Sequence, residues 1–200
     1  MIIYLIRHGQ TNCNVKKLFY GKSDVSLNPY GCQEVRALKK FLAKEIETKN
    51  IKKIFCSDRA RAIESAKILF PHRRLHKLAA LCEIDFGLFE GLHINEIEKR
   101  YPKNFAHWMK DHFHFRFPQG ESHSTFKRRV LQAFREIIQN HHEAIAIVAH
   151  GGTISMILNH LFKKSDLLAY LPPTASVTKI CLTKKTKTSL EYFGRKNRWE

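Results

Sequence analysis

The chain has 200 residues, of which 44% are hydrophobic and 26% are charged, and these proportions exclude a disordered or collagen-like protein. Its 35 lysines and arginines against 18 aspartates and glutamates give a formal net charge of +17, which attracts polyanions or phosphorylated molecules. No predicted helix carries a basic face with interleaved aromatic residues, so we interpret the charge as a solubilising surface and expect no specific nucleic acid partner.

Strands and helices alternate in the first half of the chain. The apolar segment Ile2–Ile6 predicts a buried first strand rather than a signal peptide, because it has no basic segment before it and no small-residue cleavage site after it. Asn28-Pro29 predicts the start of a helix that continues to about residue 48, with apolar residues on one face. A second strand is expected at Ile51–Cys56 and a helix at Arg59–Leu69.

The second half continues this alternation after a loop that contains Gly87 and Gly91. The uninterrupted apolar segment Ala144–Ala149 predicts a strand buried on both faces, and it is far shorter than the roughly 20 residues of a membrane-spanning helix. The further helices are expected at Ile94–Arg100, Lys103–Asp111, Ser122–Asn140 and Thr153–Leu161, and the late strands at Val177–Leu182 and Ser189–Phe193.

The alternation predicts an α/β fold with three layers, α/β/α, around a mostly parallel central sheet. In such sheets ligands bind outside the carboxyl ends of the strands. Two predicted strands end at a histidine, because Ile2–Ile6 leads into Arg7-His8 and Ala144–Ala149 leads into His150. We therefore expect the functional site at these two strand ends.

Cysteine and histidine spacing argues against disulfides and metal sites. The five cysteines are odd in number, widely spaced and form no C-x-x-C pair, so we expect reduced thiols in a cytoplasmic protein that has no membrane contact. His72 and His76 are four residues apart, and His112 and His114 alternate, but neither pair has a third ligand at a fixed spacing. We expect no metal site from either pair.

Several short motifs follow one another in a characteristic order. They are Arg7-His8-Gly9-Gln10-Thr11 with Asn14, Gly21 to Asp24, Ser57 to Ala66, Leu81 to Gly91, Pro118 to Ser122 with Arg129, and Val148 to Thr153. As an ordered set they resemble the histidine phosphatase superfamily, in its phosphoglycerate-mutase-like branch, over residues 1 to about 160. The resemblance implies one domain over residues 1–200, with a small helical insertion at about residues 88–125 over the active site.

The resemblance also implies roles for individual residues. His8 resembles the nucleophile that becomes phosphohistidine, and Arg7 and Arg61 resemble the arginines that bind the phosphate. His150 resembles the second histidine of the pocket, and Glu83 resembles the general acid that protonates the leaving oxygen. The substrate-binding residues that it implies are Asn14, Gln10, Ser57 and Gly151. It implies neither a metal ion nor another cofactor.

General chemistry explains why these residue types suit phosphoryl transfer. A neutral imidazole is a competent nucleophile at pH 7. The planar donor groups of two arginines spread positive charge over the phosphate oxygens, so a metal ion is not required for that purpose. A carboxylic acid beside a phosphate can stay protonated and give its proton to the leaving oxygen.

Two of these assignments have rivals close by in the sequence. Arg59 lies where the family usually has an apolar or small residue, so either Arg59 or Arg61 could bind the phosphate. The S-x-x-x-R-A spacing that starts at Ser57 favours Arg61. Asp85 is the rival acid to Glu83, and the spacing to the following Phe-Gly and Glu-Gly pairs favours Glu83.

An aromatic cluster lies within the expected insertion. Trp108, Phe113, Phe115 and Phe117 either wall a substrate cleft or pack a small subdomain over the edge of the sheet. The sequence alone favours neither interpretation, and the two are not exclusive.

We expect a metal-independent phosphomonoesterase that hydrolyses a small phosphorylated metabolite through phosphohistidine on His8. The main alternative is a cofactor-dependent phosphoglycerate mutase, and a third is a phosphate-binding module without catalysis. Hydrolysis is favoured because only residues 92–119 separate Gly91 from Gly120. This segment leaves little room for the closed lid that a mutase needs to keep water away from phosphohistidine.

Overall fold

The computed structural model describes residues 1–45, 50–139, 144–164, 169–183 and 188–196. Within these ranges six strands form one sheet in the order β3-β2-β4-β1-β5-β6. The strands are β1 (Ile2–Arg7), β2 (Ile51–Cys56), β3 (Leu75–Lys77), β4 (Ala144–Ala149), β5 (Val177–Leu182) and β6 (Thr188–Arg195). Strands β3, β2, β4 and β1 pair in parallel, whereas β5 is antiparallel to both β1 and β6. This confirms the predicted mostly parallel sheet.

The helices of the described ranges agree closely with the expected ones. They are α1 (Asn12–Val15), α2 (Pro29–Glu45), α3 (Ala60–Leu69), α4 (Ile94–Arg100), α5 (Pro102–Lys110), α6 (His123–Gln139) and α7 (Gly151–Phe162). The expected continuation of α2 to about residue 48 and of α6 to Asn140 falls outside the described residues. None of these helices is both long and apolar enough to cross a membrane.

Three differences from the expected elements have local causes. Helix α7 starts at Gly151 rather than at Thr153, because the extended backbone of His150 ends the strand and serves as the N-cap. Helix α1 was not predicted, since it has one turn and depends on a reciprocal capping box between Thr11 and Asn14. Strand β3 was also missed, because three residues are too short to show an alternating pattern.

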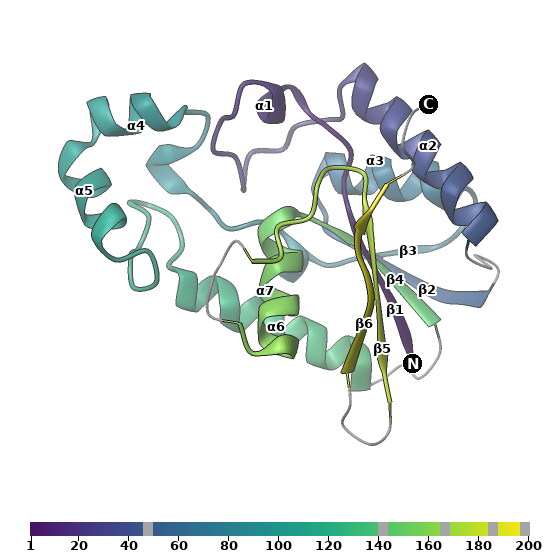
Figure 1. The fold of residues 1–200 in the computed structure, drawn as a ribbon. Coiled ribbons are helices and arrows are strands. Elements are labelled where there is room, and N and C mark those ends of the chain that lie inside the picture. Colours follow the sequence, from purple (N-terminus) through teal and green to yellow (C-terminus); the bar gives the residue numbers. More distant parts are fainter. Residues whose placement is uncertain (46–49, 140–143, 165–168, 184–187, 197–200) are drawn as a thin grey trace.

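The sheet lies between two layers of helices (Figure 1). Helices α6 and α7 cover one face, and α2 and α3 cover the other. Successive residues of β1 alternate between these layers, so that Ile3 and Leu5 pack in the first core and Tyr4 and Ile6 in the second. Each fully buried aliphatic side chain stabilises the fold by about 1.5–3 kcal/mol, so a one-residue slip of β1 is strongly disfavoured. The three-layer α/β/α arrangement is thereby confirmed.

The pairing of β1 with β4 decides where the site lies. These strands are parallel neighbours in register, with Arg7 opposite Ala149. The backbone N–H of His8 donates to the Ala149 carbonyl at 3.0 Å, and that of Ser57 donates to the Val148 carbonyl at 3.0 Å. The residues that follow β1, β2 and β4 therefore meet at the same edge of the sheet.

Helices α4 and α5 lie beyond this edge, apart from the main layers (Figure 1). Both sequence interpretations of the aromatic cluster hold for some of its members. Phe115 is buried in the core, while Trp108 and Phe117 pack there and also line a cavity. Phe113 does neither, because 51% of it is exposed.

Candidate active site

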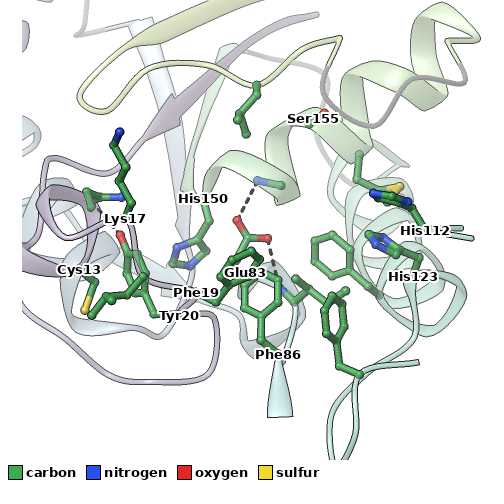
Figure 2. Close-up of a pocket in the computed structure, with 18 of the residues that line it drawn as sticks. Cys13, Lys17, Phe19, Tyr20, Glu83, Phe86, His112, His123, His150 and Ser155 are labelled. Atoms are coloured by element: carbon green, nitrogen blue, oxygen red, sulfur yellow. Dashed lines mark hydrogen bonds between the residues drawn. The ribbon is translucent and has the colours of Figure 1, made fainter. Parts of the chain in front are cut away.

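A cavity of about 590 Å³ lies at the carboxyl edge of the sheet (Figure 2). Six of the nine expected site residues line it, namely Arg7, His8, Asn14, Arg61, Glu83 and His150. Gln10, Ser57 and Gly151 do not line it. The structure therefore brings together all five residues expected to be catalytic, and one of the four expected to bind substrate.

His8 is held in one tautomer by its own loop. Its Nδ1 lies 2.7 Å from the carbonyl oxygen of Gly9, and a carbonyl can only accept, so Nδ1 carries the proton. The lone pair is then on Nε2. Burial, followed by the positive charges of Arg7 and Arg61, holds the pKa of His8 well below its usual value. The imidazole is consequently neutral at pH 7, with a free nucleophilic nitrogen.

His150 is equally buried, but both of its ring nitrogens are occupied. The Nε–H of Arg61 donates to Nδ1 at 3.2 Å, so Nε2 carries the proton and donates to the Ser57 hydroxyl at 2.8 Å. Burial, then the charge of Arg61, holds the pKa of His150 well below its usual value. Its ring centroid is 5.2 Å from that of His8, as the adjacent strands require.

Arg61 is completely buried in the first turn of α3. Besides His150, its guanidinium donates to the carbonyls of Ser23 at 2.7 Å and Gly21 at 2.8 Å, and it lies over the ring of Tyr20. A guanidinium has five N–H groups, so these three bonds leave two for an anion.

Arg7 contributes a second guanidinium to the cavity. Its Nη1 donates to the carbonyl of Pro172 at 2.6 Å, and its buried Nε has no partner among the described residues. Neither Arg7 nor Arg61 forms an ion pair with a carboxylate of the described residues. Because buried charges are normally paired, two such arginines around one cavity indicate a site for an anion.

Glu90 supports this arrangement, although the sequence analysis assigned it no role. Its carboxylate accepts the backbone N–H groups of Gly21, Lys22 and Ser23 at 2.8, 3.0 and 3.1 Å. The carbonyls of the same loop bind Arg61. The available signal was the Glu90-Gly91 pair, which belongs to the ordered motif series but has no chemistry of its own.

Glu83 faces the cavity from the loop after β3. Its carboxylate accepts the N–H of Gly152 at 2.7 Å and that of Ile84 at 3.1 Å (Figure 2). A Cβ atom at position 152 would overlap this carboxylate, so glycine allows the carboxylate to lie where it does. The start of α7 therefore orients the expected acid.

The Glu83 loop is also held from behind, by a pair that the sequence analysis did not assign. Arg129 in α6 donates to the carbonyls of Cys82 and Glu83, each at 2.8 Å. Two further bonds, at 2.8 and 2.7 Å, join its guanidinium to the carboxylate of Glu121. The motif Pro118 to Ser122 with Arg129 thus positions the acid from outside the cavity.

Asn14 lines the cavity with a defined amide orientation. Its Oδ1 accepts from the Thr11 backbone at 2.9 Å and from the Tyr20 hydroxyl at 2.7 Å. The amide NH₂ group has no partner among the described residues and can donate to a ligand.

The weaker assignments and the rivals lie outside the cavity. The Gln10 side chain accepts from Asn28, and Ser57 lies behind His150. Arg59 pairs with Asp58, and Asp85 pairs with Lys22. Because neither rival lines the cavity, the geometry favours Arg61 over Arg59 and Glu83 over Asp85.

The histidine, cysteine and carboxylate side chains are spread out over the described residues. No group of three or more histidine, cysteine, aspartate or glutamate side chains within the described ranges is placed to hold a metal ion. All five cysteines are free thiols.

Fold and site define an α/β protein that places a neutral histidine between two arginines without ion pairs, at the carboxyl edge of its sheet. The chain belongs to the histidine phosphatase superfamily (branch 1), whose sequence profile matches residues 3–193. It is thus a phosphatase of this superfamily, and the expected family, fold class and enzyme class are confirmed. Members of the family bind small phosphorylated substrates.

Three relatives illustrate the similarity. A candidate phosphoserine phosphatase 2 of Hydrogenobacter thermophilus is 30% identical over 158 residues, which are 78% of this chain and 76% of the relative. The 6-phosphofructo-2-kinase/fructose-2,6-bisphosphatase of Gallus gallus is 33% identical over 84% of this chain, but the match spans only 34% of that larger protein. The alpha-ribazole phosphatase of Shigella flexneri has the same fold, with a TM-score of 0.89 at 24% identity over 98% of this chain and 96% of its own.

Proposed function

We propose that this protein is a metal-independent phosphomonoesterase that hydrolyses a small phosphorylated metabolite through a phosphohistidine on His8. The observation that carries this proposal is the hydrogen bond from Nδ1 of His8 to the Gly9 carbonyl, which leaves Nε2 unprotonated in the cavity. A nucleophile with a free lone pair, next to two arginines that have no ion pair among the described residues, suits attack on a phosphate.

Binding of the substrate phosphate uses the groups that have unused donors. Arg7 and the two remaining N–H groups of Arg61 donate to the phosphate oxygens, and the amide NH₂ of Asn14 donates to another. The positive charge that stabilises the phosphate comes from the arginines of the protein itself, which supports metal independence. His150 keeps Arg61 in place through its Nδ1.

Hydrolysis takes two steps, and Glu83 gives up a proton in the first and takes one back in the second. In the first, Nε2 of His8 attacks phosphorus, the ester P–O bond breaks, and protonated Glu83 gives its proton to the leaving alkoxide. In the second, Glu83 as carboxylate takes a proton from water as the oxygen attacks phosphorus and the N–P bond breaks. Inorganic phosphate leaves, and both His8 and Glu83 return to their starting states.

The test measures where the phosphoryl group goes. Purified protein in EDTA is incubated with ³²P-labelled phosphomonoesters, including phosphoserine and 3-phosphoglycerate, with and without 2,3-bisphosphoglycerate. We expect labelled inorganic phosphate at a rate that EDTA does not change, and no release by His8→Ala. Conversion of 3- to 2-phosphoglycerate with little released phosphate would instead identify a mutase. Binding of phosphate without turnover of any ester would identify a non-catalytic module.

A further inference from the structure

The cavity extends well beyond the groups that would bind a phosphate. A volume of about 590 Å³ is within the range that encloses a drug-sized ligand. We call the part away from His8 the apolar end, and define it by Phe19, Phe86, Trp108, Phe117, His112 and His123, all of which line the cavity. This part offers room for the alcohol portion of an ester whose phosphate is bound at His8.

The aromatic rings of the apolar end form a connected wall. The ring centroids of Phe19 and Phe86 are 5.2 Å apart, those of Phe19 and Trp108 are 5.4 Å apart, and those of Phe86 and Phe117 are 5.0 Å apart. All three pairs meet edge to face, the arrangement that aromatic quadrupoles favour. A flat apolar group would find the same kind of contacts here.

Glu83 lies at the boundary between the two parts of the cavity. Figure 2 shows its carboxylate between His150 and Tyr20 on one side and His112 and His123 on the other. The ester oxygen that receives a proton from Glu83 therefore lies near this boundary. In the proposed reaction the phosphate lies on the side of His150, which leaves the side of the aromatic wall for the leaving group.

The apolar end contains polar atoms but no fixed charge. Burial lowers the pKa of His123, so its ring is neutral at pH 7. Its buried Nδ1 and the buried Nε1 of Trp108 have no hydrogen-bond partner among the described residues. The arginine, lysine and carboxylate side chains that line the cavity are Arg7, Lys17, Arg61 and Glu83, none of which belongs to this end. A carboxylate, ammonium or second phosphate placed there would lose its hydration without gaining an ion pair.

We infer that the apolar end binds the leaving group, and that the preferred substrates are phosphomonoesters of alcohols that carry an uncharged aromatic ring. This inference rests on the proposed hydrolysis at His8, and it deepens it by naming the class of alcohol. The preferred substrates would then differ from the acidic or doubly phosphorylated compounds that appear in the names of two relatives.

The test compares three alkyl esters with the purified protein, namely 3-phenylpropyl phosphate, propyl phosphate and phosphoserine. All three have alkoxide leaving groups, so differences in kcat/KM report recognition of the alcohol more than its departure. We expect kcat/KM for 3-phenylpropyl phosphate to exceed that for propyl phosphate about ten- to a hundredfold, because the ring is buried against the aromatic wall. Phosphoserine is expected to be no better than propyl phosphate.

Variants test whether the preference comes from the apolar end. Trp108→Ala is expected to lower the ratio of kcat/KM for phenylpropyl over propyl phosphate at least fivefold, whereas damage to the fold lowers both values and leaves the ratio. Phe113→Ala is the matched control, since this nearby aromatic residue is exposed and does not line the cavity. Met109→Arg places a charge among the lining residues and is expected to shift preference toward phosphoserine.

The outcomes separate the inference from the proposed function. Equal values for the phenylpropyl and propyl esters, or the highest value for phosphoserine, would overturn the inference and leave hydrolysis at His8 intact. An unchanged ratio in a folded Trp108→Ala protein would overturn it as well. Release of phosphate from none of the three esters would contradict the proposed function, and the inference with it.

Discussion

The Nε–H of Arg61 donates a hydrogen bond of 3.2 Å to Nδ1 of His150, although 88 residues lie between them in the chain. This contact assigns the proton of His150 to its other nitrogen, which donates to Ser57. The imidazole of His8, which lines the same cavity as Arg61, is held in the opposite tautomer by Gly9. Two neutral histidines thus have different tasks, because one keeps a free nitrogen and the other orients a cation.

Replacement of the nucleophile is expected to abolish turnover. His8→Ala should lower kcat about a thousandfold or more while the protein stays folded, since no other described nucleophile presents a free nitrogen to the unpaired arginines. Rapid quenching without acid, followed by peptide mapping, should locate the phosphoryl group of the wild type on the peptide that contains His8. A phosphoryl group on Cys13 or Ser57 would refute the assignment.

Replacement of the acid should depend on the leaving group. Glu83→Gln keeps the shape of the side chain but removes the proton, so kcat on an alkyl phosphate should fall about a hundredfold or more. The fall on p-nitrophenyl phosphate should be less than about tenfold, because nitrophenolate leaves without protonation. Asp85→Asn, at the rival position outside the cavity, should affect both substrates alike. Equal losses of kcat on both substrates in Glu83→Gln would count against Glu83 as the acid.

A methyl group at position 152 should act through Glu83. The Cβ atom of Gly152→Ala would overlap the Glu83 carboxylate, which must then move from its hydrogen bond to the backbone. We expect kcat on alkyl phosphates to fall about tenfold or more, with a smaller effect on p-nitrophenyl phosphate. Gly91→Ala is not a suitable control, because Gly91 has a positive φ of 76° and would add backbone strain. His160→Ala is a better one, because His160 is an exposed residue of the same helix and does not line the cavity. A variant with wild-type rates on both substrates would show that Glu83 does not need this contact.

Glu90 should act through Arg61. Glu90→Gln weakens the bonds that hold residues 21–23, so we expect KM to rise and kcat/KM to fall about tenfold. In a double-mutant cycle, Glu90→Gln should cost little once Arg61→Ala is present, because both changes remove the same phosphate contact. Glu96→Gln, whose carboxylate pairs with the exposed Arg100, is the control. Additive losses would indicate that Glu90 acts independently of Arg61.

The two buried histidines should make the protein less stable at acidic pH. The pKa values of His8 and His150 are well below the usual 6.5, so below about pH 6.5 the unfolded chain binds protons that the folded protein does not. The stabilisation from their neutral burial is present above that pH and is lost as pH falls. Each histidine should contribute a slope approaching about 1.4 kcal/mol per pH unit.

Urea unfolding between pH 7.5 and 5 measures this effect. As the pH is lowered, the free energy of unfolding of His150→Asn should fall less steeply than that of the wild type. The difference in slope should correspond to about one proton bound on unfolding. His72→Asn provides the control, because His72 is exposed and forms no ion pair among the described residues. Identical slopes for the wild type and His150→Asn would show that His150 is not kept neutral by the fold.

Local pattern was sufficient to predict every described strand except the three-residue β3, together with the residues at the ends of β1 and β4. Strands β1 and β4 are runs of apolar residues buried between two layers, so their hydrophobicity predicts them. The position of His8 and His150 directly after these strands then predicts where the site lies. The arginine spacing after Ser57 also distinguished Arg61 from Arg59. These signals work because burial on both faces and short-range spacing are properties of neighbouring residues.

Contacts between distant segments decided the rest. No local pattern shows that Glu90 holds the loop that binds Arg61, or that Arg129 and Glu121 fix the loop of Glu83. The apolar end is likewise assembled from α5, α6 and three loops, so its chemistry exists only after these elements pack together. The sequence by itself determined the fold class and the histidines at two strand ends, since both follow from residue patterns along short stretches. The roles expected of the site residues came from the resemblance of the ordered motifs to the family. Only the tertiary structure decided the tautomers, the unpaired charges and the shape of the cavity, because each depends on long-range hydrogen bonds and packing.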